Sequence, residues 1–149
     1  MNQMRVETEQ VVGPLLRQFV RLAHRIEQRL DGVVQPLGLS LPKLAVLQHL
    51  VQAERPLPLS ELSAHLGCAK SNMTQLIDRL EADQLVERQP DATDRRARLA
   101  AITARGRRQY AEGQRLVAAE EQAILAGVPA PDREHLARVL AEFNRHLGL

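Results

Sequence analysis

The sequence has few of the residues that usually carry redox, metal or catalytic chemistry. It contains one cysteine, Cys68, in 149 residues, which excludes an internal disulfide framework and a zinc site built from several thiolates. No two of its five histidines form an i, i+4 helical pair. There is no glycine-rich phosphate loop and no defensible pairing of a catalytic acid with a base. We therefore expect no metal, no cofactor and no enzymatic activity. The histidines are His24, His49, His65, His135 and His146.

Long hydrophobic runs are also missing. No apolar stretch approaches the roughly 18 residues that a membrane-spanning helix needs. The first ten residues, MNQMRVETEQ, lack the basic start and apolar core of a signal peptide. These absences predict a soluble cytoplasmic protein with no membrane contact.

Aromatic residues are scarce, because the chain has no tryptophan and only Phe19, Tyr110 and Phe143. With 44% hydrophobic residues, the core must be built from leucine, valine, isoleucine and alanine, which suits helices packed on helices. The length indicates one compact domain. Lysine is scarce as well, since 18 of the 20 basic residues are arginine, and the net charge is only +2. Positive charge is therefore informative only where it clusters.

The most informative stretch runs from Leu59 to Ile102. Two short amphipathic segments meet at a turn around Gly67, and two apolar-bearing runs follow on either side of a polar loop at residues 91–96. Helix, tight turn, helix and β-hairpin is the outline of a winged helix-turn-helix. We therefore predict a mainly α (α+β) fold with a winged helix-turn-helix at residues 37–103.

The second helix of this stretch has one apolar and one polar face. Met73, Leu76, Ile77 and Leu80 follow the i, i+3, i+4, i+7 spacing of a buried stripe. The other face carries short and amide side chains, which can hydrogen-bond base edges, and basic ones, which can bind phosphates. A face that merely meets water is the alternative. The candidate DNA-binding residues of this helix are Lys70, Ser71, Asn72, Thr74, Gln75 and Arg79.

The hairpin that follows has the strongest charge feature of the chain. Between Arg95 and Arg108 there are six arginines and no carboxylate. Arg95 and Arg96 at the tip are placed to enter a DNA minor groove, with Arg98 beside them. Asp94 can orient one of these guanidinium groups by a bidentate pair. The alternative is a solvated turn with a surface ion pair that contributes little.

Long helices are predicted on both sides of the winged region. They span residues 8–36, Ala104 to about Ala126 after an N-cap at Thr103, and Asp132 to His146. A shorter helix begins after Ser40, and the prolines near Leu57 favour an extended segment that joins the wing sheet. The long helices carry more apolar surface than one small domain can cover. We expect residues 1–36 and 104–149 to form a homodimer interface, although closure within a monomer is the alternative.

The run from Leu59 to Arg107 resembles the multiple-antibiotic-resistance regulator (MarR) family of transcription regulators. The matching motifs are LSEL with HLG at residues 59–67, DRLE at 78–81, DRRA at 94–97 and ITARGR at 102–107. With the flanking helices, the resemblance covers nearly the whole chain. It implies a homodimeric repressor on palindromic double-stranded DNA, released by a small-molecule effector that binds where the dimer helices meet the winged region.

Two positions depart from that family. Ala69 stands where a serine usually caps the recognition helix, and Gln75 stands where an arginine is frequent.

Two other functions stay open. A winged-helix protein–protein adaptor would have lost DNA contact, and a redox-sensing regulator would use Cys68, which otherwise packs as a small hydrophobic residue. His24 and His49 are candidates to line an effector pocket.

Overall fold

A computed structural model describes residues 13–91 and 98–148 of the chain. It confirms the predicted α+β fold, in which helices accompany one small antiparallel sheet. The elements are α2 (Pro14–Val34), η1 (Gln35–Leu37), α3 (Leu41–Ala53), β1 (Leu57–Pro58), α4 (Leu59–His65), α5 (Lys70–Ala82), β2 (Val86–Pro90), β3 (Arg98–Ile102), α6 (Ala104–Leu125) and α7 (Ala130–Leu147).

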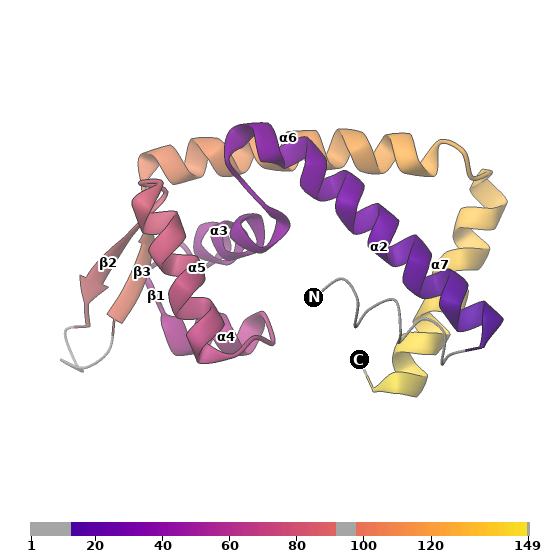
Figure 1. The fold of residues 1–149 in the computed structure, drawn as a ribbon, viewed down its shortest axis with the longest axis horizontal. Coiled ribbons are helices and arrows are strands. Elements are labelled where there is room, and N and C mark those ends of the chain that lie inside the picture. Colours follow the sequence, from indigo (N-terminus) through magenta and orange to yellow (C-terminus); the bar gives the residue numbers. More distant parts are fainter. Residues whose placement is uncertain (1–12, 92–97, 149) are drawn as a thin grey trace.

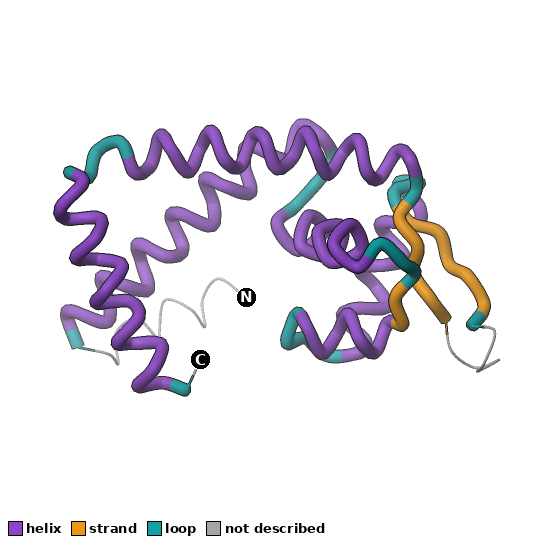
Figure 2. Tube along the Cα trace, turned by 180° about the vertical axis from the view of Figure 1, so that it is seen from behind, coloured by secondary structure: helices purple, strands orange, loops and turns teal. Residues whose placement is uncertain are grey.

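The molecule has a winged lobe at one end and an arm of long helices at the other. Figure 1 shows α6 leaving the lobe beside the sheet, running along the top of the molecule and turning into α7 at the far end. Helix α2 packs against α6 near the lobe and runs diagonally toward α7. The view from behind shows the same separation, with every strand confined to the lobe (Figure 2).

The hydrophobic core lies in the winged lobe and follows the predicted stripes. Met73, Ile77 and Leu80 of α5 are fully buried, as the periodicity predicts, and Leu76 is half-buried. Val46 of α3 is also buried, together with Leu44, Leu47 and Leu50 of the same helix. The reason is that α3 is enclosed on several sides, by α2, α5, α6 and β3.

The wing sheet has the strand order β1-β3-β2 and is antiparallel throughout. Leu57 pairs with Ala100, which confirms that the proline-flanked segment joins the sheet. Proline has no N–H to donate, so a strand that contains Pro58 suits an edge position. The register pairs Val86 with Ile102 and continues outward along the hairpin.

The predicted helix caps are present, and the predicted bounds shift slightly. Ser40 accepts a hydrogen bond from the Lys43 N–H at 3.4 Å, and Thr103 accepts one from the Gly106 N–H at 2.9 Å. The first long helix ends at Val34, before the predicted residue 36, because the chain tightens there into the 3₁₀ turn η1. Its predicted start falls outside the described residues. Helix α7 begins at Ala130, before the predicted Asp132, because a proline fits the first turn of a helix.

A tight junction connects the end of the helix-turn-helix to the start of α6. Gln84 has a positive φ of 60°, and its carbonyl oxygen accepts a hydrogen bond from the Thr103 hydroxyl at 2.8 Å. The Thr103 N–H donates to the Leu85 carbonyl oxygen at 3.1 Å. Gly106 lies directly against that same carbonyl. The winged lobe and the long helix α6 are therefore joined by backbone contacts rather than by a loose linker.

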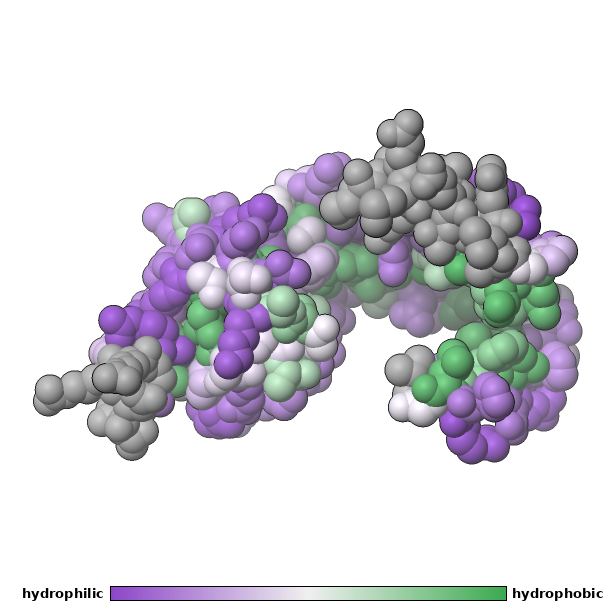
Figure 3. Space-filling view, turned by 60° about the horizontal axis from the view of Figure 1, so that its bottom comes forward, coloured by the Kyte–Doolittle hydropathy of each residue, from purple (hydrophilic) through white to green (hydrophobic). Residues whose placement is uncertain are grey.

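The far end of the arm exposes hydrophobic side chains. Figure 3 shows them gathered over the end of the molecule opposite the wing. The rings of Phe19 in α2 and Phe143 in α7 are in contact, with centroids 5.5 Å apart, but this contact leaves most of the apolar surface uncovered. The exposed residues are Leu15, Leu16, Val20 and Leu22 of α2, and Leu136, Leu140 and Leu147 of α7.

Candidate nucleic-acid interface

A glycine turn sets the angle between the two helices of the helix-turn-helix. Gly67 has a φ of 58°, a conformation that side-chain-bearing residues rarely adopt. Its N–H donates to the Ala64 carbonyl at 3.3 Å, and the Cys68 N–H donates to the Ser63 carbonyl at 3.0 Å. Cys68 is half-buried and packs against the hydrophobic core. Ala69 then begins α5 without a side-chain cap, as its methyl group requires.

The polar face of α5 is exposed over its whole length. Gln75, in the middle of this face, has no hydrogen-bond partner within the part of the chain that the structure describes. Thr74 differs, because its hydroxyl donates to the Lys70 carbonyl oxygen at 3.0 Å. The hydroxyl proton of Thr74 is therefore already used, and its hydroxyl oxygen can only accept a further hydrogen bond. The exposed residues of the face are Lys70, Ser71, Asn72, Thr74, Gln75, Asp78 and Arg79.

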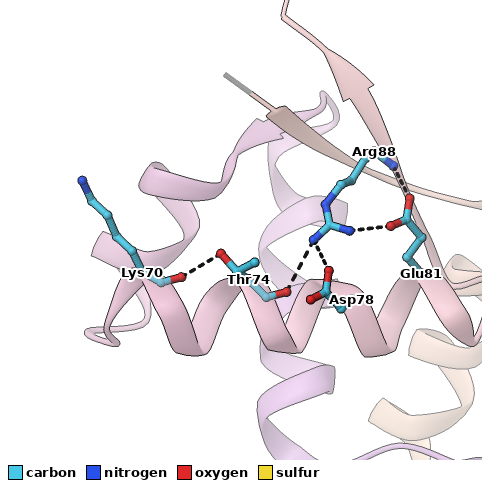
Figure 4. Close-up of polar contacts among 5 residues, drawn as sticks. All are labelled: Lys70, Thr74, Asp78, Glu81 and Arg88. Carbon is cyan, nitrogen blue, oxygen red and sulfur yellow. Dashed lines mark hydrogen bonds and ion pairs between the residues drawn. The ribbon is translucent and has the colours of Figure 1, made fainter. Parts of the chain in front are cut away.

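Arg88 of β2 joins the wing to α5 (Figure 4). Its guanidinium group donates to Asp78 at 2.5 Å, to Glu81 at 2.5 Å and to the Thr74 carbonyl at 3.4 Å. The Arg88 N–H also donates to Glu81 at 3.2 Å. Sequence reasoning missed this residue. The available signal was an i, i+3 pair of carboxylates, Asp78 and Glu81, followed by a basic residue on the next strand.

The ion pairs also act on the pKa of Arg88. Partial burial on its own would lower that pKa, but the hydrogen bonds to Asp78 and Glu81 and the charges of these carboxylates outweigh it. The pKa of Arg88 is raised as a result, so the residue stays charged at any physiological pH.

The tip of the wing lies outside the described residues, and with it Asp94, Arg95 and Arg96. Arg98 is described and exposed at the start of β3, where it pairs with Pro90 of β2.

Comparisons with known proteins agree with this geometry. Residues 37–97, the helix-turn-helix and the wing, match the model described as the MarR family. Residues 37–97 of the chain are therefore similar to the MarR family. A curated relative, an HTH-type transcriptional repressor of Mycobacterium tuberculosis, is 28% identical over 132 residues, which cover 89% of this chain and 94% of that protein. A solved structure from a Rhodococcus species, described as a MarR-family transcriptional regulator, is 23% identical and covers 87% of this chain and 91% of that one, with a TM-score of 0.74.

Solved MarR-family structures share the fold. A variant of MarR from Escherichia coli, complexed with operator DNA, aligns with a TM-score of 0.76 at 23% identity and covers 87% of this chain and 93% of that one. CouR from Rhodococcus jostii, bound to p-coumaroyl-CoA, aligns with a TM-score of 0.71 at 22% identity, covering 87% and 90%. These likenesses confirm the winged helix-turn-helix architecture with its long flanking helices.

A cavity of about 360 Å³ opens between α2 and the start of α3. His24 lines this cavity, whereas His49 lies elsewhere, with its ring stacked on that of His65 and the centroids 5.2 Å apart. The lining residues are His24, Glu27, Gln28, Asp31, Leu41 and Pro42.

Helix α3 connects this cavity to α5. Asp31 accepts a hydrogen bond from the Leu41 N–H at 2.8 Å and so fixes the start of α3 to α2. Two residues later, Lys43 donates to Asp83 at 2.7 Å. Asp83 is the C-cap residue of α5. The start of α3 is therefore bonded both to the cavity wall and to the end of α5.

Other chemistry finds no support among the described residues. Within residues 13–91 and 98–148, no three histidine, cysteine, aspartate or glutamate side chains lie together as a metal site requires. Across the same ranges, no helix combines the length and apolar character needed to cross a membrane.

Proposed function

We propose that this protein is a homodimeric, sequence-specific DNA-binding regulator of the MarR family, acting as a repressor. The observation that carries the proposal is the exposed polar face of α5, which lies beside an arginine-bearing wing on one side of the lobe. An α-helix of this kind fits the major groove, and its amide side chains pair with base edges. The Escherichia coli variant of the same fold was solved in complex with operator DNA, which supports DNA binding.

The proposal assigns separate roles to the two parts of the interface. Gln75 sits in the middle of the exposed face and can make a bidentate pair with adenine. Lys70 and Arg79 flank it at positions suited to phosphates. The wing arginines Arg95, Arg96 and Arg98 enter or border the minor groove, with Asp94 orienting one of them.

We infer that α2, α6 and α7 form the two-fold interface of the dimer, and that residues 37–103 act as its DNA-binding part. The exposed leucine and valine side chains at the far end of α2 and α7 support this division. Two recognition helices related by a two-fold axis require half-sites whose centres lie about 10 to 10.5 base pairs, one helical turn, apart.

Two substitutions test base reading separately from groove contact. On a duplex selected by the protein from random sequences, Gln75→Ala should weaken binding by about 1–3 kcal/mol, with little change on scrambled DNA or in the salt dependence. Arg96→Ala should weaken binding to both duplexes and flatten the salt slope by about one unit. Titrations of both variants at several salt concentrations measure both effects.

The outcome also separates this proposal from the protein–protein adaptor. An adaptor would bind neither duplex, and both substitutions would leave its properties unchanged. If Gln75→Ala binds both duplexes like the parent, α5 does not read bases through that residue.

We propose further that the cavity beside α2 and α3 binds a small organic effector that weakens DNA binding. The link from Asp31 through α3 to Lys43 and Asp83 supports this, because a ligand that shifts α3 also shifts the end of α5. The acyl-CoA complex of CouR supports ligand binding by relatives, without identifying the ligand of this chain.

A small-molecule screen by melting temperature tests the effector proposal. A ligand of the cavity should raise the melting temperature and weaken DNA affinity, and DNA should weaken ligand affinity by the same factor. Gln28→Trp, which places an indole in the cavity wall, should abolish the ligand response. Gln18→Trp, the same change on α2 away from the cavity, should preserve it. Ligands that raise the melting temperature but leave DNA affinity unchanged count against the proposal.

A further inference from the structure

We propose that Arg88 is a positioning residue for DNA recognition: it holds the carboxylates of Asp78 and Glu81 so that neither opposes the DNA backbone. This inference rests on the proposed DNA-binding function and extends it to a residue outside the polar face of α5. Arg88 would act through the two carboxylates rather than by touching DNA.

The contacts show that Arg88 is held against α5, an arrangement called here the clamp, rather than extending freely into solvent. The guanidinium group of Arg88 reaches two carboxylates and one backbone carbonyl of the same helix, and its side chain is only 22% exposed. Asp78 is 57% exposed and lies on the polar face with Gln75. An acidic residue there is unfavourable for a helix that enters a DNA groove, unless a cation accompanies it.

The charge balance of α5 shows why one cation matters. Its charged residues are Lys70, Asp78, Arg79 and Glu81, and their formal charges cancel. The helix as a whole therefore adds no net positive charge to the face that would meet DNA. Arg88 brings a positive charge from β2 to the side that carries both carboxylates, as Figure 4 shows. With Glu87 of β2 included, α5 and β2 together are neutral, and without Arg88 they would carry a net charge of −1.

The clamp also fixes the recognition helix relative to the wing. Arg88 is in the middle of β2, where its Cα pairs with that of Ala100 in β3. Its bonds to Thr74, Asp78 and Glu81 span two turns of α5. Helix and wing must meet different grooves of one duplex at the same time, so a fixed angle between them favours binding. The carboxylates of these ion pairs are 57% and 40% exposed, and pairs with exposed partners contribute little to folding. We therefore expect the lobe to fold when Arg88 is replaced.

A double-mutant cycle tests the proposal. It compares the full-length parent, Arg88→Met, the pair Asp78→Asn with Glu81→Gln, and all three changes combined, on a selected and a scrambled duplex. Arg88→Met alone should weaken binding to both duplexes about 10-fold. In the background that lacks both carboxylates, Arg88→Met should change DNA affinity by less than about 2-fold, because no carboxylate remains to be neutralised.

Two controls isolate the mechanism. Arg115→Met removes an arginine that pairs with Glu112 on the surface of α6, so it changes the net charge equally and should leave DNA binding nearly unchanged. Arg88→Lys keeps the charge but loses the planar fork, and it should restore part of the lost affinity. It also serves as the test variant if Arg88→Met fails to fold, which melting curves report directly.

The salt dependence separates a clamp from a direct phosphate contact. A residue that binds phosphate flattens the salt slope by about one unit when removed, whereas a residue that positions others leaves it nearly unchanged. Equal losses in both backgrounds together with a flatter slope would overturn the inference and make Arg88 a phosphate contact. If the parent binds neither duplex, the proposed function itself fails and this inference fails with it. If the parent binds and the cycle shows no coupling, only the inference fails.

Discussion

Replacing Gly106 with alanine is expected to lower the melting temperature by about 6–12 °C. A methyl group at this position would overlap the Leu85 carbonyl oxygen and lie 2.9 Å from a side-chain carbon of Ile102. The first contact is with backbone, which cannot move aside as the end of a flexible side chain can. Relief requires α6 to withdraw from the start of β2.

That withdrawal would break the junction that holds the two parts of the chain together. The Leu85 carbonyl accepts the Thr103 N–H, and Thr103 in turn caps α6 through the Gly106 N–H. Steric overpacking and a weakened cap together cost about 3 kcal/mol. Thermal or urea unfolding of the full-length variant measures the loss.

Gly32→Ala is the matched control for this substitution. Gly32 lies inside α2 and is exposed, and no heavy atom lies within 4 Å of the position that an added methyl group would take. Alanine there should stabilise the helix by about 0.5–1 kcal/mol, because glycine is a poor helix former. Both variants replace glycine with alanine, but they should change the free energy of unfolding in opposite directions. A Gly106→Ala variant as stable as the parent would show that α6 does not pack on Leu85 as described.

The winged lobe was predictable from sequence because its signals are local. The apolar stripe of α5 and the caps at Ser40 and Thr103 are set by residues within one or two turns of each other. The position of Gly106 against Leu85 was not predictable in this way. Gly106 looks like part of a helix start in the sequence, and only the fold shows that a carbonyl from a distant segment occupies the space of its side chain.

Part of the candidate site was predictable because helical periodicity is also a local signal. Helical periodicity identifies which residues of α5 face outward, and the structure exposes all six that were proposed for DNA contact. Helical periodicity does not reveal which residues of other elements contact α5. Arg88 acts on α5 from β2 across 10 residues of sequence in its bond to Asp78. The back-bond of the Thr74 hydroxyl is local, but nothing in the residue pattern distinguishes it from a hydroxyl directed at DNA.

Placing glutamate at both Val20 and Leu140 is expected to turn a dimer into a monomer. These side chains, on α2 and α7, are 50% and 42% exposed in a single chain, so a charged replacement costs the monomer little. In the proposed dimer they are covered by the second copy, where an unpaired carboxylate is strongly unfavourable. Light scattering should give twice the 16.7-kDa chain mass for the parent and one chain mass for the double variant.

The loss of the dimer should affect DNA binding far more than any single contact. Two linked recognition helices gain a large effective concentration for the second half-site, an advantage of about 10²- to 10⁴-fold. The double variant should lose about that much affinity for a palindromic duplex, and almost none for a single half-site. Gln18→Glu adds one carboxylate to the same helix about half a turn from Val20, at a position that is already polar, and should remain dimeric. A parent protein that is monomeric at micromolar concentration, or a double variant that still binds the palindrome like the parent, would refute the two-fold arrangement.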